Sequence, residues 1–343
     1  MNRAEVAHAR SGAMSCYPTS TQRRFWTLSR DEIQKRRSDA RARAIESARE
    51  AKIAAGEPAG PDDGPEPLTP EEETLLRRYY EAKILKVCAA FGMPSKVQAT
   101  AVTLFKRFLL GTSLLQHNAK VIMLTAIYCA CKVEENYISA EEFCKGMGQD
   151  TDASRVLNAE LTLLAGLRFQ LVTYSPYRAL DGFRRDLEAE AVNDAEVATP
   201  SERLDACAAA AREVTDRQML TDAPLMHAPG SLALAALRSA ARQLGVESVT
   251  RYVSRAGAGG DGAEGAVADA AAVARSLDEI DEIVAAEGKE PNEDVVRDID
   301  KKLKTWRTSN PAPKAEGEKG EKREAKRRKS EAATRDAEDA ALG

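Results

Sequence analysis

The side chains that most often bind zinc, cysteine and histidine, are too dispersed in this sequence to form a metal site. His8, His117 and His227 are far apart in sequence, and none of the six cysteines forms a Cys-x-x-Cys pair. A zinc site usually needs four such ligands in closely spaced pairs. Cys129 and Cys131 are two residues apart on an expected helix, so their side chains point about 160° apart. We interpret them as buried thiols and expect no bound metal.

The run from Gly257 to Gly262 formally matches the dinucleotide-binding pattern G-x-G-x-x-G. That pattern binds a pyrophosphate where a strand leads into it and a helix begins at its last glycine. Here the preceding residues 249–253 have a helical pattern, and no β-α-β unit surrounds them. We therefore interpret the run as a loop between helices. Because no P-loop, nucleophile elbow or kinase signature occurs either, we expect a protein that is not an enzyme.

Two charged residues stand in strongly apolar surroundings. On one expected helix Glu160 lies within an apolar stripe of Leu157, Leu161 and Leu164, and Lys132 ends the most apolar helix of the chain. Burying an unpaired charge is costly. The two side chains could lie at the rim of the core or pair within the chain, and residue geometry alone favours this interpretation. Alternatively, they could border an apolar surface that binds another protein.

Apolar periodicity predicts helices along most of the chain. Aromatic residues make up only 5% of the 343 residues whereas Ala and Leu are abundant, and this composition favours helix over strand. One helix would bury a stripe at spacings of three and four, formed by Val97, Ala101, Leu104, Phe105 and Phe108. A first set of five helices is predicted near 70–91, 95–110, 118–134, 139–147 and 152–167. A second set is predicted near 176–191, 200–220, 229–245, 246–255 and 263–287.

These helices predict an all-α protein with two consecutive five-helix folds and flanking N- and C-terminal helices. Ser29 and Glu32 form a capping box for a polar helix, which we expect to be exposed on a surface. A last amphipathic helix carries Val295, Val296, Ile299, Leu303 and Trp306. The predicted segments are an N-terminal segment 1–29, a helix 30–55, a linker 56–70, a first fold 71–171, a second fold 172–288, a C-terminal helix 289–307 and a disordered charged tail 308–343.

Charge and hydropathy exclude some further classes. The longest apolar run, 121–131, has 11 residues, fewer than the roughly 20 that a bilayer-spanning helix needs. No apolar segment typical of a secretory signal occurs at the N-terminus, so we expect a soluble intracellular protein. The net charge of −4 is unevenly distributed, with six basic residues among the eight of 322–329. This cluster is typical of a nuclear import signal, a nucleic-acid patch or a solvated charge run.

Several segments resemble the cyclin family. Residues 130–135 (A-C-K-V-E-E) and 159–161 (A-E-L) resemble the cyclin box, with its signature lysine and glutamate at Lys132 and Glu160. Residues 105–108 (F-K-R-F) resemble transcription-type cyclins, since mitotic cyclins carry an aspartate before the arginine. Further segments resemble the cyclin H group: 20–27, 79–81, 175–178, 182–183 and 220–223. The similarity extends over about residues 17–307.

The resemblance implies two cyclin folds and a non-catalytic, nuclear regulatory subunit of the CDK-activating kinase. The implied partners are the catalytic subunit of a cyclin-dependent kinase, a RING-type assembly factor and transcription factor IIH. Through them the complex would phosphorylate cell-cycle kinases and the tail of RNA polymerase II. No cofactor is implied for this chain, because ATP and magnesium would belong to the kinase.

By the same resemblance, Lys132 and Glu160 would hold the region of the kinase's C-helix. The apolar surface around them would consist of Val133, Leu164, Phe169 and Leu171. Two alternatives stay open at this point. The chain could be a transcription-type cyclin of the C or K/L/T group with another kinase, or a DNA- and protein-binding module similar to initiation factor IIB. The two folds are not notably basic, as a DNA-tracking surface should be.

Overall fold

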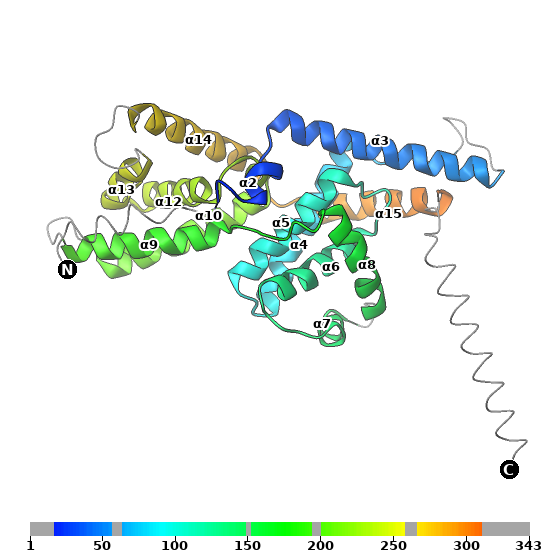
Figure 1. Ribbon diagram of the computed structural model, residues 1–343, viewed down its shortest axis with the longest axis horizontal. Helices are drawn as coiled ribbons and strands as arrows, with labels where there is room; N and C mark the ends of the chain where they lie inside the picture. Colours follow the sequence, from blue (N-terminus) through cyan, green and yellow to red (C-terminus); the bar gives the residue numbers. More distant parts are fainter. Residues whose placement is uncertain (1–16, 57–63, 149–151, 194–199, 258–265, 311–343) are drawn as a thin grey trace, which may run out of the picture.

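The computed structural model describes residues 17–56, 64–148, 152–193, 200–257 and 266–310. Within these ranges the chain forms fourteen α-helices and no strand. Figure 1 shows two groups of helices side by side, with long helices flanking the first group. We refer to these groups as the first repeat (α4–α8) and the second repeat (α9–α14). The part of the chain that the structure describes contains no helix long and apolar enough to span a membrane.

The first repeat has the five predicted helices. They are α4 (Pro70–Ala90), α5 (Ser95–Gly111), α6 (Ala119–Val133), α7 (Ala140–Gly146) and α8 (Ala153–Gly166). The sequence predicted every boundary to within one residue. Four of the five helices begin at a side-chain cap, such as the capping box that Thr69 and Glu72 form before α4. The five residues of the predicted α5 stripe are buried. α6 is buried over most of its circumference and contacts α4, α5 and α8.

The second repeat has the other five predicted helices and one short helix that the sequence did not predict. They are α9 (Pro176–Asn193), α10 (Ser201–Met219), the short α11 (Ala223–Met226), α12 (Pro229–Leu244), α13 (Glu247–Gly257) and α14 (Ala266–Glu287). α12 is central and contacts α9, α10, α13 and α14. α13 ends at Gly257, so a helix precedes the glycine run. The rest of that run, 258–262, lies outside the described residues.

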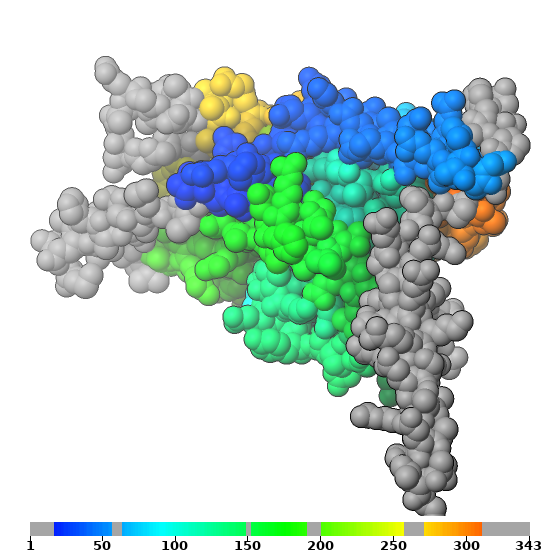
Figure 2. Space-filling view, turned by 45° about the vertical axis from the view of Figure 1, so that its right-hand side comes forward, coloured from blue at the N-terminus to red at the C-terminus, as the bar shows by residue number. Residues whose placement is uncertain are grey.

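The N-terminal residues form the short helix α2 (Thr21–Phe25) and the long helix α3 (Arg30–Ala54), which begins at the predicted capping box. α3 lies along the first repeat and contacts α5 (Figure 2). The expectation of an exposed helix was wrong for one face, which buries Ile33, Ala40, Ala44 and Ala48. Alanines spaced four residues apart lack large side chains, so the two helix backbones can approach closely. A search for bulky apolar residues therefore misses this face.

The C-terminal helix α15 (Glu293–Ser309) packs on the outside of α4. It buries four of the five predicted stripe residues: Val296, Ile299, Leu303 and Trp306. Val295, the fifth, is exposed, because it lies one position to the side of this stripe. Ion pairs tie the start of α15 and the residues before it to α4, with Lys83 Nζ 3.0 Å from a Glu293 oxygen and Lys86 Nζ 2.5 Å from a Glu290 oxygen.

The predicted linker 56–70 and tail 308–343 are only partly described, since 57–63 and 311–343 lie outside the described residues. The described end of the linker is fixed to the fold. Leu68 is fully buried, and its carbonyl accepts hydrogen bonds from Arg41 Nε at 3.0 Å and Nη2 at 2.6 Å. α3 therefore holds the chain where it enters α4.

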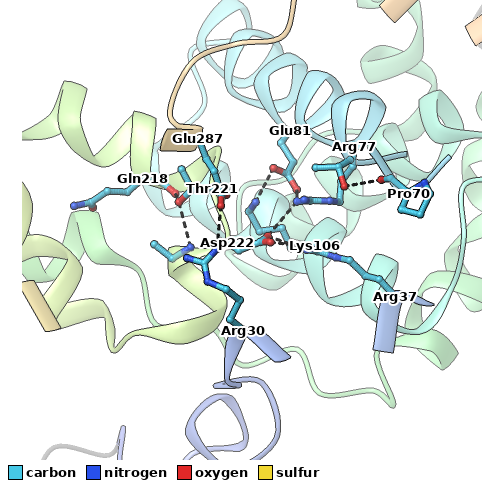
Figure 3. A network of polar contacts seen from close by, with 12 residues as sticks. Arg30, Arg37, Pro70, Arg77, Glu81, Lys106, Gln218, Thr221, Asp222 and Glu287 are labelled. Carbon is cyan, nitrogen blue, oxygen red and sulfur yellow. Dashed lines mark hydrogen bonds and ion pairs between the residues drawn. The ribbon is translucent and has the colours of Figure 1, made fainter. Parts of the chain in front are cut away.

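A buried ionic network joins α3 and the two repeats (Figure 3). Glu81 accepts from Lys106 Nζ at 2.6 Å and from Arg77 Nη1 at 2.7 Å, and the Lys106 and Glu81 side chains are completely buried. Asp222 of the second repeat lies 3.3 Å from Arg77 and accepts two hydrogen bonds from Arg37 of α3, at 2.6 and 2.8 Å. The network links three parts of the fold that are far apart in sequence.

Candidate protein-binding surface

The structure brings Lys132 and Glu160 together. Lys132 lies in the last turn of α6 and Glu160 in α8, 28 residues later, and Lys132 Nζ donates a hydrogen bond to Glu160 Oε1. That hydrogen bond raises the pKa of Lys132. The ammonium also lies 5.3 Å from the ring centroid of Tyr128. The pair is accessible, since the Lys132 side chain is 51% exposed and the Glu160 side chain 19%.

The leucines around Glu160 face outward. The sequence predicted Leu157, Leu161 and Leu164 as a packing stripe, but Leu157 is 41% and Leu161 67% exposed. Val156 and Leu163, two turns apart, are the residues that α8 buries in the core. Periodicity could not distinguish the two faces, because α8 carries apolar residues on both. The pairing within the chain that residue geometry favoured is therefore present, and the leucines beside the pair are exposed, as the alternative of an apolar surface requires.

The other predicted surface residues differ in exposure. Phe169 is 63% exposed, Val133 and Leu164 are half-buried, and Leu171 packs partly against the core of the first repeat. Sequence reasoning missed Val172, which is 54% exposed in the connection between the repeats. An apolar residue in a segment without helical pattern was the signal that could have identified it.

Three non-glycine residues with positive φ, the only ones in the described ranges, follow the two helices that carry the pair. Glu135 (φ 56°) follows α6, and Arg168 (φ 53°) and Phe169 (φ 55°) follow α8. Such a conformation costs on the order of 1 kcal/mol per residue. Hydrogen bonds offset this cost, for example from Phe169 N–H to the Leu164 carbonyl at 2.9 Å. Strained backbone is often retained at binding sites, here beside the exposed Phe169.

Hydrogen bonds from α5 hold the two backbone segments beside the Lys132–Glu160 pair. Thr100 of α5 donates to Glu134 Oε1 at 2.7 Å, and its hydroxyl lies 2.6 Å from that of Thr173. Lys96 Nζ donates to the Glu134 carbonyl. α5 therefore fixes both the end of α6 beside Lys132 and the connection between the repeats.

The two cysteines of α6 are buried thiols. Cys129 and Cys131 are buried as predicted, and burial raises the pKa of Cys129 to about 12, which leaves the thiol protonated and unreactive at neutral pH. Among the residues that the structure describes, no three His, Cys, Asp or Glu side chains lie close enough to hold a metal ion.

A cavity of about 710 Å³ lies elsewhere, between α3, α4 and the second repeat. Its charged lining residues pair with one another: Arg37 with Asp222 at 2.6 Å, and Arg41 with Glu73 at 3.3 Å. The cavity is thus separate from the Lys132–Glu160 pair, and most of its charges already have partners.

Exposed apolar residues grouped around a charged pair are typical of a protein-interaction site. The family description "Cyclin, N-terminal domain" matches residues 66–172, and "Cyclin C-terminal domain" matches residues 175–285. The chain therefore belongs to the cyclin family. Cyclin-H1-1 of Arabidopsis thaliana is 39% identical over 259 residues, which cover 70% of this chain and 75% of that protein. Within the family, the chain therefore belongs to the cyclin H group.

Solved structures show the same fold. A chain of the CAK complex of Chaetomium thermophilum bound to ATP-gamma-S superposes with a TM-score of 0.72 at 26% identity, covering 91% of each chain. A chain of the yeast TFIIK (Kin28/Ccl1/Tfb3) complex has a TM-score of 0.57 at 26% identity, covering 78% of this chain and 100% of that one.

Proposed function

We propose that this chain is the regulatory subunit that binds and activates the cyclin-dependent kinase of a CDK-activating kinase. The observation that carries the proposal is the accessible Lys132–Glu160 pair beside the exposed Leu157, Leu161 and Phe169, within a cyclin box. The similarity to chains of the CAK and TFIIK complexes supports it. A RING-type assembly factor, transcription factor IIH and a nuclear location belong to the same proposal.

Activation would follow from differential binding. A protein kinase transfers phosphate when the lysine of its third strand and the glutamate of its C-helix form an ion pair. A subunit that binds the helix-in conformation more tightly than the helix-out conformation shifts the population toward the active form by that difference in affinity. The cyclin contributes no catalytic group in this mechanism, and ATP and magnesium are held by the kinase.

The surface residues have separate roles in this proposal. An ammonium has three donors, and Lys132 gives one to Glu160, so it can donate to carbonyl groups at the kinase's C-helix. Such charge-assisted hydrogen bonds fix the register of the two proteins. Leu161 and Phe169 supply apolar area, and its burial against the partner provides most of the affinity.

The test is recovery of the kinase from native lysate by wild type, Lys132→Glu, Glu160→Lys and the double variant, with phosphorylation of a kinase substrate as a second measurement. The double variant restores an ion pair within the chain but presents reversed charges to the partner. We expect all three variants to lose the kinase and its activation while their circular dichroism stays helical.

Each other outcome is informative. If the double variant regains binding, the pair serves only the fold, and the site assignment fails. If wild type recovers a different cyclin-dependent kinase, the chain is a cyclin with another partner. Recovery of DNA in place of a kinase would contradict the proposed function as a whole.

A further inference from the structure

The connection between the repeats, residues 168–174, contains no helix or strand. The N–H groups of residues 168–170 bond to carbonyls at the end of α8. Buried backbone groups need partners, and the carbonyls of Gln170 and Val172 and the N–H of Tyr174 receive them from side chains of α5 and of the N-terminal segment. The connection carries two exposed apolar side chains, Phe169 and Val172, at 63% and 54% exposure. How these side chains are presented therefore depends on what holds this backbone.

Arg107 of α5 is the first of these supports. Its side chain is buried, and Nη1 donates to the carbonyls of Gln170 at 3.3 Å and Val172 at 3.1 Å. Among the described residues Arg107 forms no ion pair with a carboxylate, and its Nε and Nη2 are buried with no hydrogen-bond partner there. Burial lowers the pKa of Arg107 to about 9. A buried cation without a carboxylate is costly for the fold, so stability alone does not explain it.

The N-terminal segment is the second support, and Figure 2 shows it in blue beside the green of the connection. Trp26 Nε1 donates to Gln170 Oε1 at 2.8 Å, and the Trp26 ring covers the Arg107 guanidinium at 5.4 Å. Gln22 accepts from Tyr174 N–H at 2.7 Å. Residues about 145 positions earlier in the sequence thus complete the hydrogen bonding of the connection.

We infer that Trp26 and Arg107 are positioning residues, which hold the connection so that Phe169 and Val172 are presented as part of the kinase-binding surface. This inference rests on the proposed function. It assigns to the N-terminal segment a role in the affinity for the kinase, because Trp26 holds Gln170 of the connection. Neither Trp26 nor Arg107 needs to touch the kinase, since both are buried.

The experiment compares the full-length chain with Trp26→Phe, which removes the indole N–H, and with Arg107→Lys, which cannot bridge two carbonyls in the same way. The control is Trp306→Phe, because Trp306 has the same 5% exposure as Trp26 and belongs to α15, which packs on α4. Three quantities are measured: thermal stability, hydrogen exchange of amides 168–174, and the Kd for the purified kinase at a temperature where every variant is folded.

We expect Trp26→Phe and Arg107→Lys to speed exchange in 168–174 and to raise the Kd about tenfold, the effect of roughly one hydrogen bond. Trp306→Phe should change stability alone. If Trp26→Phe binds the kinase as wild type does, the positioning role is wrong. A Kd that rises equally in Trp306→Phe would also overturn it, because any loss of packing would then suffice. If wild type itself fails to bind, the proposed function fails instead.

Discussion

Lys106 has an unusual position for an ammonium group, since it is fully buried between Glu81 and the core of the first repeat. Burial lowers the pKa of Lys106 to about 8, although the nearby Glu81 opposes this shift. The ion pair with Glu81 therefore compensates only part of the cost of removing the charge from water. Arg77 shares the same carboxylate at 2.7 Å, so Glu81 keeps a partner if Lys106 is replaced.

The lowered pKa gives a prediction with a defined sign. Between pH 8 and the ordinary pKa of 10.5, the folded chain releases the Lys106 proton and the unfolded chain keeps it. Stability from this group therefore rises with pH. From pH 7 to pH 9 the unfolding free energy of wild type should increase by about 1 kcal/mol relative to Lys106→Met.

The measurement is urea unfolding of both proteins at the two pH values, and other titrating groups cancel in the difference. If the difference in unfolding free energy between wild type and Lys106→Met is the same at both pH values, Lys106 keeps its proton in the folded protein.

α8 has two apolar faces, of which one is buried in the core and the other is exposed. The inward face holds Leu163, which is fully buried, and the outward face holds Leu161, two residues away and 67% exposed. Because Leu161 is largely exposed, replacing it with a smaller side chain should change the stability of the fold very little. Its apolar area matters where a partner covers it.

This contrast predicts opposite effects of the same substitution on one helix. Leu161→Ser should change the unfolding free energy by less than about 0.5 kcal/mol but weaken kinase binding. Leu163→Ser should lower the unfolding free energy by about 2–5 kcal/mol. Thermal unfolding and kinase titration of both variants check this. Unchanged kinase affinity in Leu161→Ser would remove the outward face of α8 from the binding surface.

The elements differ in how well the sequence predicted them. α5 and α7 were predictable because local signals define them, namely a single apolar stripe in α5 and the capping box of Ser139 and Glu142 before α7. The orientation of α8 was not, because two apolar faces compete and only the packed core selects one.

Local sequence patterns also could not predict contacts between residues that are far apart in the sequence. Lys106 and Arg107 could be placed on α5, but their partners come from residues such as Glu81 and Gln170 on other elements. The Lys132–Glu160 contact was suggested by family resemblance and by charges among apolar residues. The structure adds the contact itself and the exposure around it.

At the scale of the whole molecule, Asp222 is where the second repeat meets the first. Burial alone would raise its pKa, but Arg77 and Arg37 hold the pKa of this carboxyl well below its usual range. Arg77 belongs to the first repeat and Arg37 to α3. The same carboxylate therefore stabilises the junction of all three parts, and it does so only while it is ionised.

Asp222→Asn should accordingly destabilise the protein by about 2–3 kcal/mol at neutral pH, because Arg37 loses its carboxylate partner and the buried Arg77 keeps only Glu81. The carboxylate contributes stability above its unfolded pKa of about 4 and loses it as pH falls further. The difference from wild type should therefore shrink between pH 5 and pH 3. Urea unfolding across this range measures it.

Asp278→Asn is the matched control, since Asp278 also pairs with an arginine, Arg238 at 2.8 Å, but is 64% exposed. It should cost less than about 1 kcal/mol. Equal costs for the two variants would contradict a special role of the junction.

The same junction limits how such a protein can be recombined. Exchanging the second repeat for that of a distant relative moves Asp222 away from Arg77 and Arg37, which stay behind with the first repeat and α3. A crossover within the connection 168–174 would also separate this backbone from Trp26 and Arg107. Chimeras should therefore fold and assemble only when residues at the junction are transferred together, so the two repeats depend on each other despite having separate cores.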